Sequence, residues 1–309
     1  MFESARIKIL AVIFFFCICS ASHASEDMSL RLQNFIEETD VIASSGKTSK
    51  QKADLVKAAY ERRFSSDIAG VPAQELEALF EATQYMMFYT LDKTKLPLFE
   101  HLFKTLSGAG KTTLDHEQKL LQMYFALREF DKANAFLQGS YHGRSRSGPI
   151  SVNDLANPSL KRTVWVFHGR RSLTRRDAGL EKGVNLVIIG SPFCHFARNA
   201  LAAMESSPAL APLLKDRVKL MAMQDFSFDY DTYAAWNRAH PALPFVLTHS
   251  REEWPEVSRW ASPVFLFFRD GKLESQFSGW PEEGNMEKVY AGFGIASSDL
   301  VPVQAGRDR

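Results

Sequence analysis

The sequence predicts an all-α N-terminal domain followed by an α/β domain, a central sheet with helices on both faces. Three observations support this prediction. Apolar residues recur every three or four positions across residues 28–139, which is typical of amphipathic helices. A stretch rich in Gly, Ser, Pro and Asn follows and indicates a linker. From residue 163 onward, short apolar runs alternate with helical patterns, as in an α/β sheet.

The first 24 residues have the features of a secretory signal peptide. Arg6 and Lys8 precede an apolar stretch of eleven residues, and the small residues between Ser20 and Ala24 provide a cleavage site. Eleven apolar residues are too few to span a bilayer as a helix. We therefore expect cleavage, no integral membrane segment in the mature chain, and a periplasmic or secreted location.

The charge balance argues against nucleic acid as a partner. The chain has 37 basic and 36 acidic residues, and loss of Arg6, Lys8 and Glu3 with the signal peptide leaves 35 of each. A mature net charge of zero produces no general attraction to polyanions. Cys17 and Cys19 leave with the signal peptide, so Cys194 is the one cysteine of the mature chain and no internal disulfide is expected.

Five segments of the N-terminal domain have helical periodicity. They are residues 29–43, 51–64, 73–91, 95–106 and 115–137. The last has a tight bend near Phe130 and resembles the helix-turn-helix of a tetratricopeptide repeat, although no 34-residue recurrence precedes it. An ordinary helical bundle is the alternative.

The segment SGAGKTT, residues 107–113, resembles a phosphate-binding loop but lacks two of its requirements. Thr105 occupies the place of the required glycine five positions before Gly110, and a helical pattern precedes the segment where the motif needs a strand. The sequence instead predicts a loop and a helix cap at Thr112 or Thr113.

The domain boundaries follow from these patterns. They are a signal peptide at 1–24, an α-helical domain at 25–139, a linker at 140–162, an α/β domain at 163–295 and a flexible tail at 296–309. Strands are predicted at 163–168, 171–176, 184–190, 218–224, 244–249, 263–268 and 272–279. Helices are predicted at 194–206, 231–240, 252–260 and 285–293.

Two local signatures of the α/β domain resemble the thioredoxin fold. The first is a strand, a turn and a helix that begins at Cys194, across residues 184–206. The second is WASPVFLFFRDGKLESQFSGW at 260–280, which is similar to the thioredoxin cis-proline, strand, Asp-Gly turn and strand ending in glycine. The hairpin before them resembles the entry of exported TlpA-like and cytochrome-maturation thioredoxins. The resemblance covers residues 163–295 and concerns the fold more than the activity.

The sequence departs from the thioredoxin pattern at positions that carry the chemistry. Phe193 replaces the tryptophan before the first cysteine, and Ala197 stands where the second cysteine of the CxxC pair belongs. Ile188 stands where many thioredoxins keep a buried carboxylate that moves a proton for the second cysteine. Both losses affect resolution of a mixed disulfide and leave its formation possible.

The predicted site is built around Cys194 as nucleophile, because a helix N-terminus favours the thiolate form of a cysteine. His195 beside it adds positive charge when protonated, and the resemblance implies that Pro263 is the cis-proline that lies against the sulfur. Phe193, Ser262 and Trp280 are predicted to contact substrate, Trp280 as a surface contact. The expected function is single-cysteine thiol–disulfide exchange or assembly assistance with another protein as partner.

Two alternatives remain open. In a single-cysteine peroxidase Ser191 would qualify as the hydroxyl three positions before Cys194, but Val187 stands where a proline is needed. In a non-catalytic interaction module Cys194 is a packing residue, as free cysteines commonly are. No cofactor and no metal ion is expected, since His240 and His249 show no tight ligand spacing with Cys194.

Overall fold

The computed structural model describes residues 27–64, 71–72, 75–139, 148–157, 159–169 and 171–296. The predicted signal peptide and most of the predicted tail lie outside these residues, as do residues 140–147 and Pro158 of the predicted linker.

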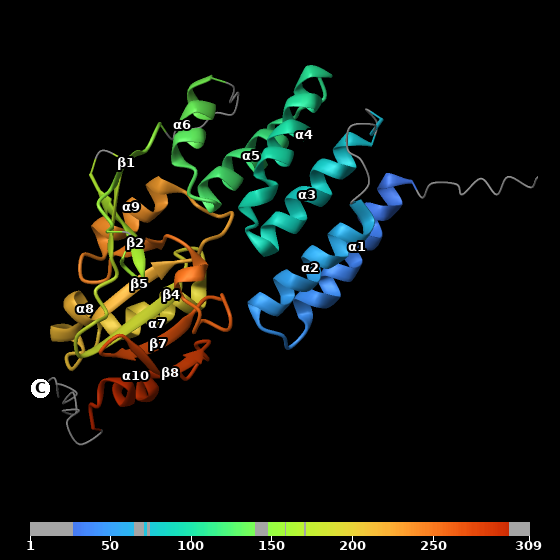
Figure 1. Ribbon diagram of the computed structural model, residues 1–309. Helices are drawn as coiled ribbons and strands as arrows, with labels where there is room; N and C mark the ends of the chain where they lie inside the picture. The colour runs from blue at the N-terminus through green and yellow to red at the C-terminus, as the bar shows by residue number, and fades with distance from the viewer. Residues whose placement is uncertain are drawn as a thin grey trace, which may run out of the picture.

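Helices form the whole of the described N-terminal region, as the sequence predicts. They are α1 (Met28–Ser44), α2 (Ser49–Phe64), α3 (Leu76–Thr90), the 3-10 helix η2 (Lys93–Lys95), α4 (Leu96–Gly108), α5 (Leu114–Ala126) and α6 (Phe130–Gly139). They lie side by side as a stack that leads from the N-terminal end of the chain to the sheet (Figure 1). Thr113 caps α5, and because its side chain and that of His116 each accept a backbone N–H, the two form a capping box. The segment 107–113 thus connects two helices, and the phosphate-loop reading is excluded.

One mixed sheet of eight strands forms the second region. The strands are β1 (Ser151–Asp154), β2 (Thr163–His168), β3 (Ser172–Asp177), β4 (Val184–Gly190), β5 (Val218–Ala222), β6 (Phe245–Thr248), β7 (Val264–Arg269) and β8 (Lys272–Ser278). Their order is β1-β3-β2-β6-β5-β4-β7-β8. The central strand β4 pairs in parallel with β5 and antiparallel with β7, so the turn after β4, the end of β5 and the start of β7 meet at one edge.

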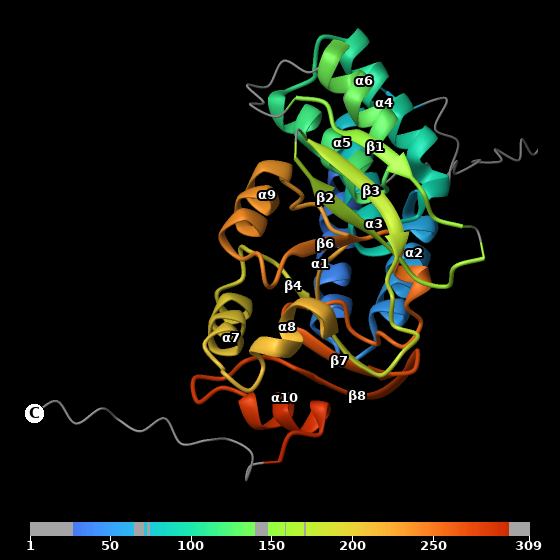
Figure 2. The ribbon, with the colours of Figure 1, turned by 90° about the vertical axis from the view of Figure 1, so that its left-hand side faces the viewer.

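The two faces of the sheet are covered differently. On one face Leu186 and Ile188 of β4 pack against α7 (His195–Glu205), α8 (Ala211–Arg217), α9 (Tyr230–Ala239) and α10 (Met286–Phe293). Figure 2 shows α7 and α9 beside the strands. On the other face Val187 and Ile189 pack against Trp254 and Val257. That cover comes from the 3-10 helix η3 (Arg251–Glu253) and the turns after it, where the sequence predicts a short helix.

The helical region and the sheet share one continuous apolar core. Phe130 at the start of α6 meets the ring of Trp165 on β2 at a centroid distance of 5.2 Å. Buried polar contacts add to this junction: the Gln224 side chain donates to the Ala126 carbonyl at 2.8 Å, and the Arg128 Nε–H donates to the Thr248 carbonyl at 2.9 Å. The helices are therefore packed directly on the sheet.

Two elements were not predicted from the sequence. Strand β1 lies inside the predicted linker and pairs in parallel with β3, and the Asn134 side chain fixes the preceding Ile150 by two hydrogen bonds of 2.8 Å. Helix α8 follows Pro208 in a stretch too short to show a helical period. The predicted linker is thus in part a strand at the edge of the sheet.

Candidate functional site

The candidate site lies where β4 ends and α7 begins. Cys194 occupies the N-cap position of α7, and its own N–H donates to the Ser191 carbonyl at 3.1 Å. The first N–H groups of an α-helix have no acceptor within the helix, so the thiol sits at the positive end of the helix dipole. The side chain of Cys194 is half-buried. The position gives a thiol that a partner can reach.

The segment before β7 lies against this thiol. The peptide bond between Ser262 and Pro263 is cis, and the Cys194 Sγ is 3.4 Å from the Ser262 carbonyl oxygen. The Ser262 hydroxyl is buried without a hydrogen-bond partner among the described residues. Two chain segments 68 residues apart thus meet at one sulfur, and the second places a backbone carbonyl beside it.

Aromatic rings flank the thiol on the surface. Phe193 and Phe196 are 53% and 47% exposed, large values for side chains of this size. The His195 ring lies against Phe196 at a centroid distance of 3.8 Å, and no hydrogen bond between His195 and Cys194 occurs in the described part of the chain. His195 is therefore exposed next to the thiol, without a contact that fixes it as an acid or base.

Behind the thiol the helix is packed and apolar. Ala197 is fully buried and faces Gly190, since a Cβ built on that glycine would lie 3.6 Å from the Ala197 Cβ. Ile188 is fully buried in β4. The positions where thioredoxins carry a second cysteine and a proton-moving carboxylate thus hold packing residues here, as the sequence indicated.

Trp280 corrects the sequence analysis. We predicted it as a surface contact, but it is only 6% exposed, and its ring packs on Phe265 at 5.7 Å and lies under Gly284. Trp280 lies two residues after the end of β8 and turns inward, where it closes the end of the core beneath β7. It supports the strand that follows Pro263 and does not offer a platform to substrate.

Sequence reasoning missed a polar cluster that supports the Cys194 turn. Tyr233 on α9 is buried, interacts with the Ser191 side chain and meets the Phe193 ring at 6.4 Å. Burial, and then the negative charge of Asp225, raise the pKa of the Tyr233 hydroxyl. The hydroxyl thus stays protonated and can donate. The sequence places Tyr233 in the helix predicted at 231–240 and indicates no role for it.

His240 and His249 contact other side chains and not the thiol. His240 stacks on Trp236 at a centroid distance of 3.9 Å, and its Nδ1 lies 2.8 Å from the Glu205 carboxylate. The His249 Nδ1 accepts a hydrogen bond from the Trp165 Nε1 at 3.1 Å. Within the described ranges no group of three or more His, Cys, Asp or Glu side chains is arranged to hold a metal ion. The same residues include no helix long and apolar enough to cross a membrane.

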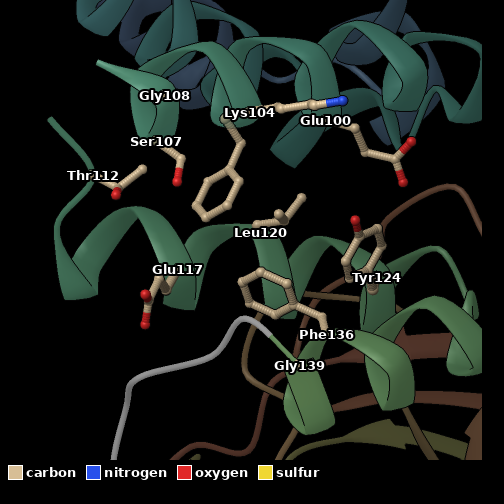
Figure 3. Close-up of a pocket in the computed structure, with 11 residues that line it drawn as sticks. Glu100, Lys104, Ser107, Gly108, Thr112, Glu117, Leu120, Tyr124, Phe136 and Gly139 are labelled. Carbon is tan, nitrogen blue, oxygen red and sulfur yellow. The ribbon is translucent and has the colours of Figure 1, made fainter. Parts of the chain in front are cut away.

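A second feature of the molecule is a cavity of about 690 Å³ between α4, α5 and α6. Figure 3 shows Leu120, Tyr124 and Phe136 pointing into it, with Glu100 and Lys104 of α4 at its rim. Glu100 also pairs with Lys132 at 2.8 Å. The cavity has an apolar floor and a polar rim, which is the make-up of many ligand pockets.

Among known proteins, several solved structures are similar to this chain. No protein-family model matches the chain, and no curated protein is similar to it. A secreted disulfide oxidoreductase of Mycobacterium tuberculosis, homologous to E. coli DsbE, is 14% identical, over 40% of this chain and 90% of that chain, with a TM-score of 0.31. A putative thioredoxin of Neisseria meningitidis is 11% identical, over 45% and 94%, at 0.30. A thioredoxin-like protein of Bacteroides caccae is 11% identical, over 81% and 95%, at 0.31.

The identities and TM-scores of these three structures are low. The fold of the second region is therefore described from the elements of this chain. The order from β4 through the Cys194 turn to α7, and from Pro263 through β7, the Asp270-Gly271 turn and β8, is the order that the two sequence signatures implied. The second region of the chain is an α/β domain with a thioredoxin-like fold, and the first is an all-helical region packed on it.

Proposed function

We propose that this protein carries out single-cysteine thiol–disulfide exchange with other proteins, in a periplasmic or extracellular compartment. The observation that carries the proposal is the position of Cys194, half-buried at the N-terminus of α7 with its sulfur 3.4 Å from the Ser262 carbonyl. A thiol in this position is within reach of a partner and next to a backbone carbonyl that can bind an extended peptide.

The reaction is an exchange with no net redox change. The Cys194 thiolate attacks one sulfur of a disulfide in the partner, so a Cys194–partner disulfide forms and the original disulfide breaks. The departing partner sulfur leaves as a thiolate and takes a proton from water. A second thiolate, from the partner or from a small thiol such as glutathione, then attacks the mixed disulfide and regenerates Cys194.

The two positions that serve the second step in thioredoxins hold apolar side chains here. Ala197 is buried where a resolving thiol would lie, and Ile188 is buried where a carboxylate would take up its proton. We therefore expect the mixed disulfide to persist until an external thiol arrives. Such a protein rearranges or holds partner disulfides and does not reduce them catalytically by itself.

The exposed rings beside the thiol favour a protein partner. Phe193 and Phe196 form an apolar surface on both sides of Cys194 in the sequence, and the Ser262 carbonyl can accept a hydrogen bond from an extended peptide. Main-chain hydrogen bonds together with apolar contacts are a common basis for peptide recognition. His195 lies in the same exposed turn, where it can contact the partner.

A non-catalytic interaction module is the second candidate. The cavity between α4, α5 and α6 favours it, because a pocket of about 690 Å³ can bind a partner without any chemistry at Cys194. In that case the thiol would be inert.

A non-reducing gel distinguishes the two candidates. The full chain is expressed with its own N-terminal segment in a Gram-negative host, as wild type, Cys194→Ser and Ala197→Cys, and extracts are alkylated before electrophoresis. We expect thiol-sensitive adducts for wild type, none for Cys194→Ser and fewer for Ala197→Cys, because a second thiol can release the partner. Absence of adducts in wild type, together with alkylation of Cys194 no faster than that of a free cysteine peptide, would refute exchange and favour the module.

A further inference from the structure

A second, smaller cavity lies between the helical region and the sheet edge that carries the thiol. It has a volume of about 290 Å³. Helices α2 and α3 contribute Lys52 and Tyr89, and the α/β region contributes Asp225, Arg251 and Trp260. Ligand pockets usually have about 300–1,000 Å³, so this cavity is at the small end of that range.

The cavity is close to Cys194 by two independent routes. Trp260 lines the cavity and precedes Ser262, whose carbonyl contacts the Cys194 sulfur, by two residues. Since an extended chain covers at most about 3.6 Å per residue, the Cα atoms of Trp260 and Ser262 are within about 7 Å of each other. Ala222 at the end of β5 pairs with Gly190 at the end of β4, so Met223, which also lines the cavity, is level with the start of the Cys194 turn. The cavity therefore lies beside the turn that carries Cys194.

The wall formed by the helices is fixed in place. The Ser49 N–H donates to the Ser258 carbonyl at 2.9 Å, and the Trp260 N–H donates to the Ser49 Oγ at 3.0 Å. On the other side Phe88 packs on Phe226 at a centroid distance of 5.2 Å. The helical region thus forms a permanent side of the cavity.

Charges around the cavity are mainly positive. Lys52 and Arg251 line the cavity together with one carboxylate, Asp225. Arg128 does not line the cavity but is close enough to Arg251 for the two positive charges to repel each other. Burial lowers the pKa of both arginines to about 10, so both are protonated at neutral pH. Asp225 attracts both arginines, and one carboxylate does not balance three cations.

We propose that this cavity is a substrate subsite that takes an acidic side chain, Glu or Asp, of the protein whose cysteine is joined to Cys194. The proposal rests on the proposed function and names its substrate class: a disulfide with an acidic residue about two positions from the attacked cysteine. The rings of Tyr89 and Trp260 form walls for the aliphatic part of that side chain, and Lys52 and Arg251 attract its carboxylate.

The test uses peptides in which one cysteine is joined to thionitrobenzoate. The Cys194 thiolate attacks the peptide sulfur, the peptide disulfide to Cys194 forms, and coloured thionitrobenzoate leaves, so its absorbance gives the rate. Two series, X-Gly-Cys and Cys-Gly-X, with X as Glu, Gln or Lys, cover both chain directions. In one series we expect the peptide with Glu to react about tenfold faster than the peptide with Lys, a rate difference that charges in a cleft commonly produce. High salt should reduce this difference.

Variants at Lys52 locate the effect. Lys52→Glu is expected to remove the preference for Glu, and Lys52→Arg to keep it, because arginine retains the charge and a donor for the Ala43 carbonyl that Lys52 now contacts. The matched control is Lys47→Glu, an exposed lysine of the loop between α1 and α2 that does not line the cavity.

The outcomes separate the two proposals. Equal rates for Glu, Gln and Lys in both series, at a rate well above that of a free cysteine peptide, overturn the subsite and leave the exchange function standing. Loss of the preference in Lys47→Glu as well as in Lys52→Glu also overturns the subsite, because the effect is then one of overall charge. No reaction of Cys194 with any peptide overturns the proposed function and the subsite together.

Discussion

Lowering the pH from 7 to 5 is expected to destabilise the protein through His249, the residue that follows β6. Its Nδ1 accepts a hydrogen bond from the Trp165 Nε1 at 3.1 Å, which requires the neutral ring. Burial, and then the positive charges of Arg175 and Arg128, lower the pKa of His249 from 6.5 to about 4, and Asp154 opposes this only in part. The imidazole therefore stays neutral in the folded protein well below its ordinary pKa.

The sign of the effect follows from proton binding. Between about pH 6.5 and pH 4 the unfolded chain binds a proton at His249 that the folded protein does not bind, so unfolding becomes more favourable as the pH falls. The linkage relation with these two values gives an upper limit of about 2 kcal/mol lost between pH 7 and pH 5. Because His249 is only half-buried, water screens part of the interaction, and we expect about 1 kcal/mol.

The assay compares wild type with His249→Gln, whose side-chain oxygen can still accept from Trp165 but does not titrate. Urea unfolding followed by circular dichroism at pH 7, 6 and 5 gives the free energy of unfolding of each. Between pH 7 and pH 5 the free energy of unfolding of the wild type should fall by about 1 kcal/mol more than that of His249→Gln. The control is His101→Gln, at an exposed position of α4, which should show the same pH dependence as the wild type. A constant difference between wild type and His249→Gln across this range would refute the reasoning.

Two further predictions concern packing and the junction between the regions. Gly292→Ala should destabilise the protein by about 1–3 kcal/mol in a thermal melt, because the new Cβ would lie 2.3 Å from the Phe267 ring and force α10 off the sheet. The control is Gly108→Ala, which should be nearly neutral in the same measurement because a Cβ there meets nothing within 4 Å. Gln224→Leu should lower the free energy of unfolding in urea by about 2–3 kcal/mol, because it leaves the Ala126 carbonyl and the Arg251 N–H without partners. The control Gln276→Leu, at an exposed position of β8, should change the free energy of unfolding little. An equal response to both glutamine replacements would contradict the role of the buried amide.

The elements that the sequence predicted correctly are those with a strong local signal. Strand β4 is apolar except for Asn185 because both faces of the sheet are covered there. Helix α5 has both a helical period and a capping residue. Strand β1 has neither: its residues are polar and mostly exposed, and it exists because its backbone pairs with β3. The helix predicted over 252–260 fails at Pro255, since the residue before a proline avoids the helical region, and Trp254 turns into the core instead.

The candidate site divides in the same way. A cysteine between a strand and a helix is readable from the order of residues, so Cys194 could be found. Trp280 was misjudged because a tryptophan just past a strand has no local sign of which way it turns. The cavity beside Lys52 and Trp260 could not be anticipated, because it depends on how residues about 200 positions apart in the chain come together, which no periodicity records.

The continuous core between the helical region and the sheet has a consequence for how the protein unfolds. Phe130 and Trp165 pack in the same cluster as the strands, and the side chains of Arg128 and Gln224 are bonded across the junction. Helices that shared few contacts with the sheet would melt by themselves and give two transitions. Here we expect a single cooperative transition, with a denaturant dependence set by the surface of the whole chain, so that loosening the helices also loosens the strand edge that holds Cys194.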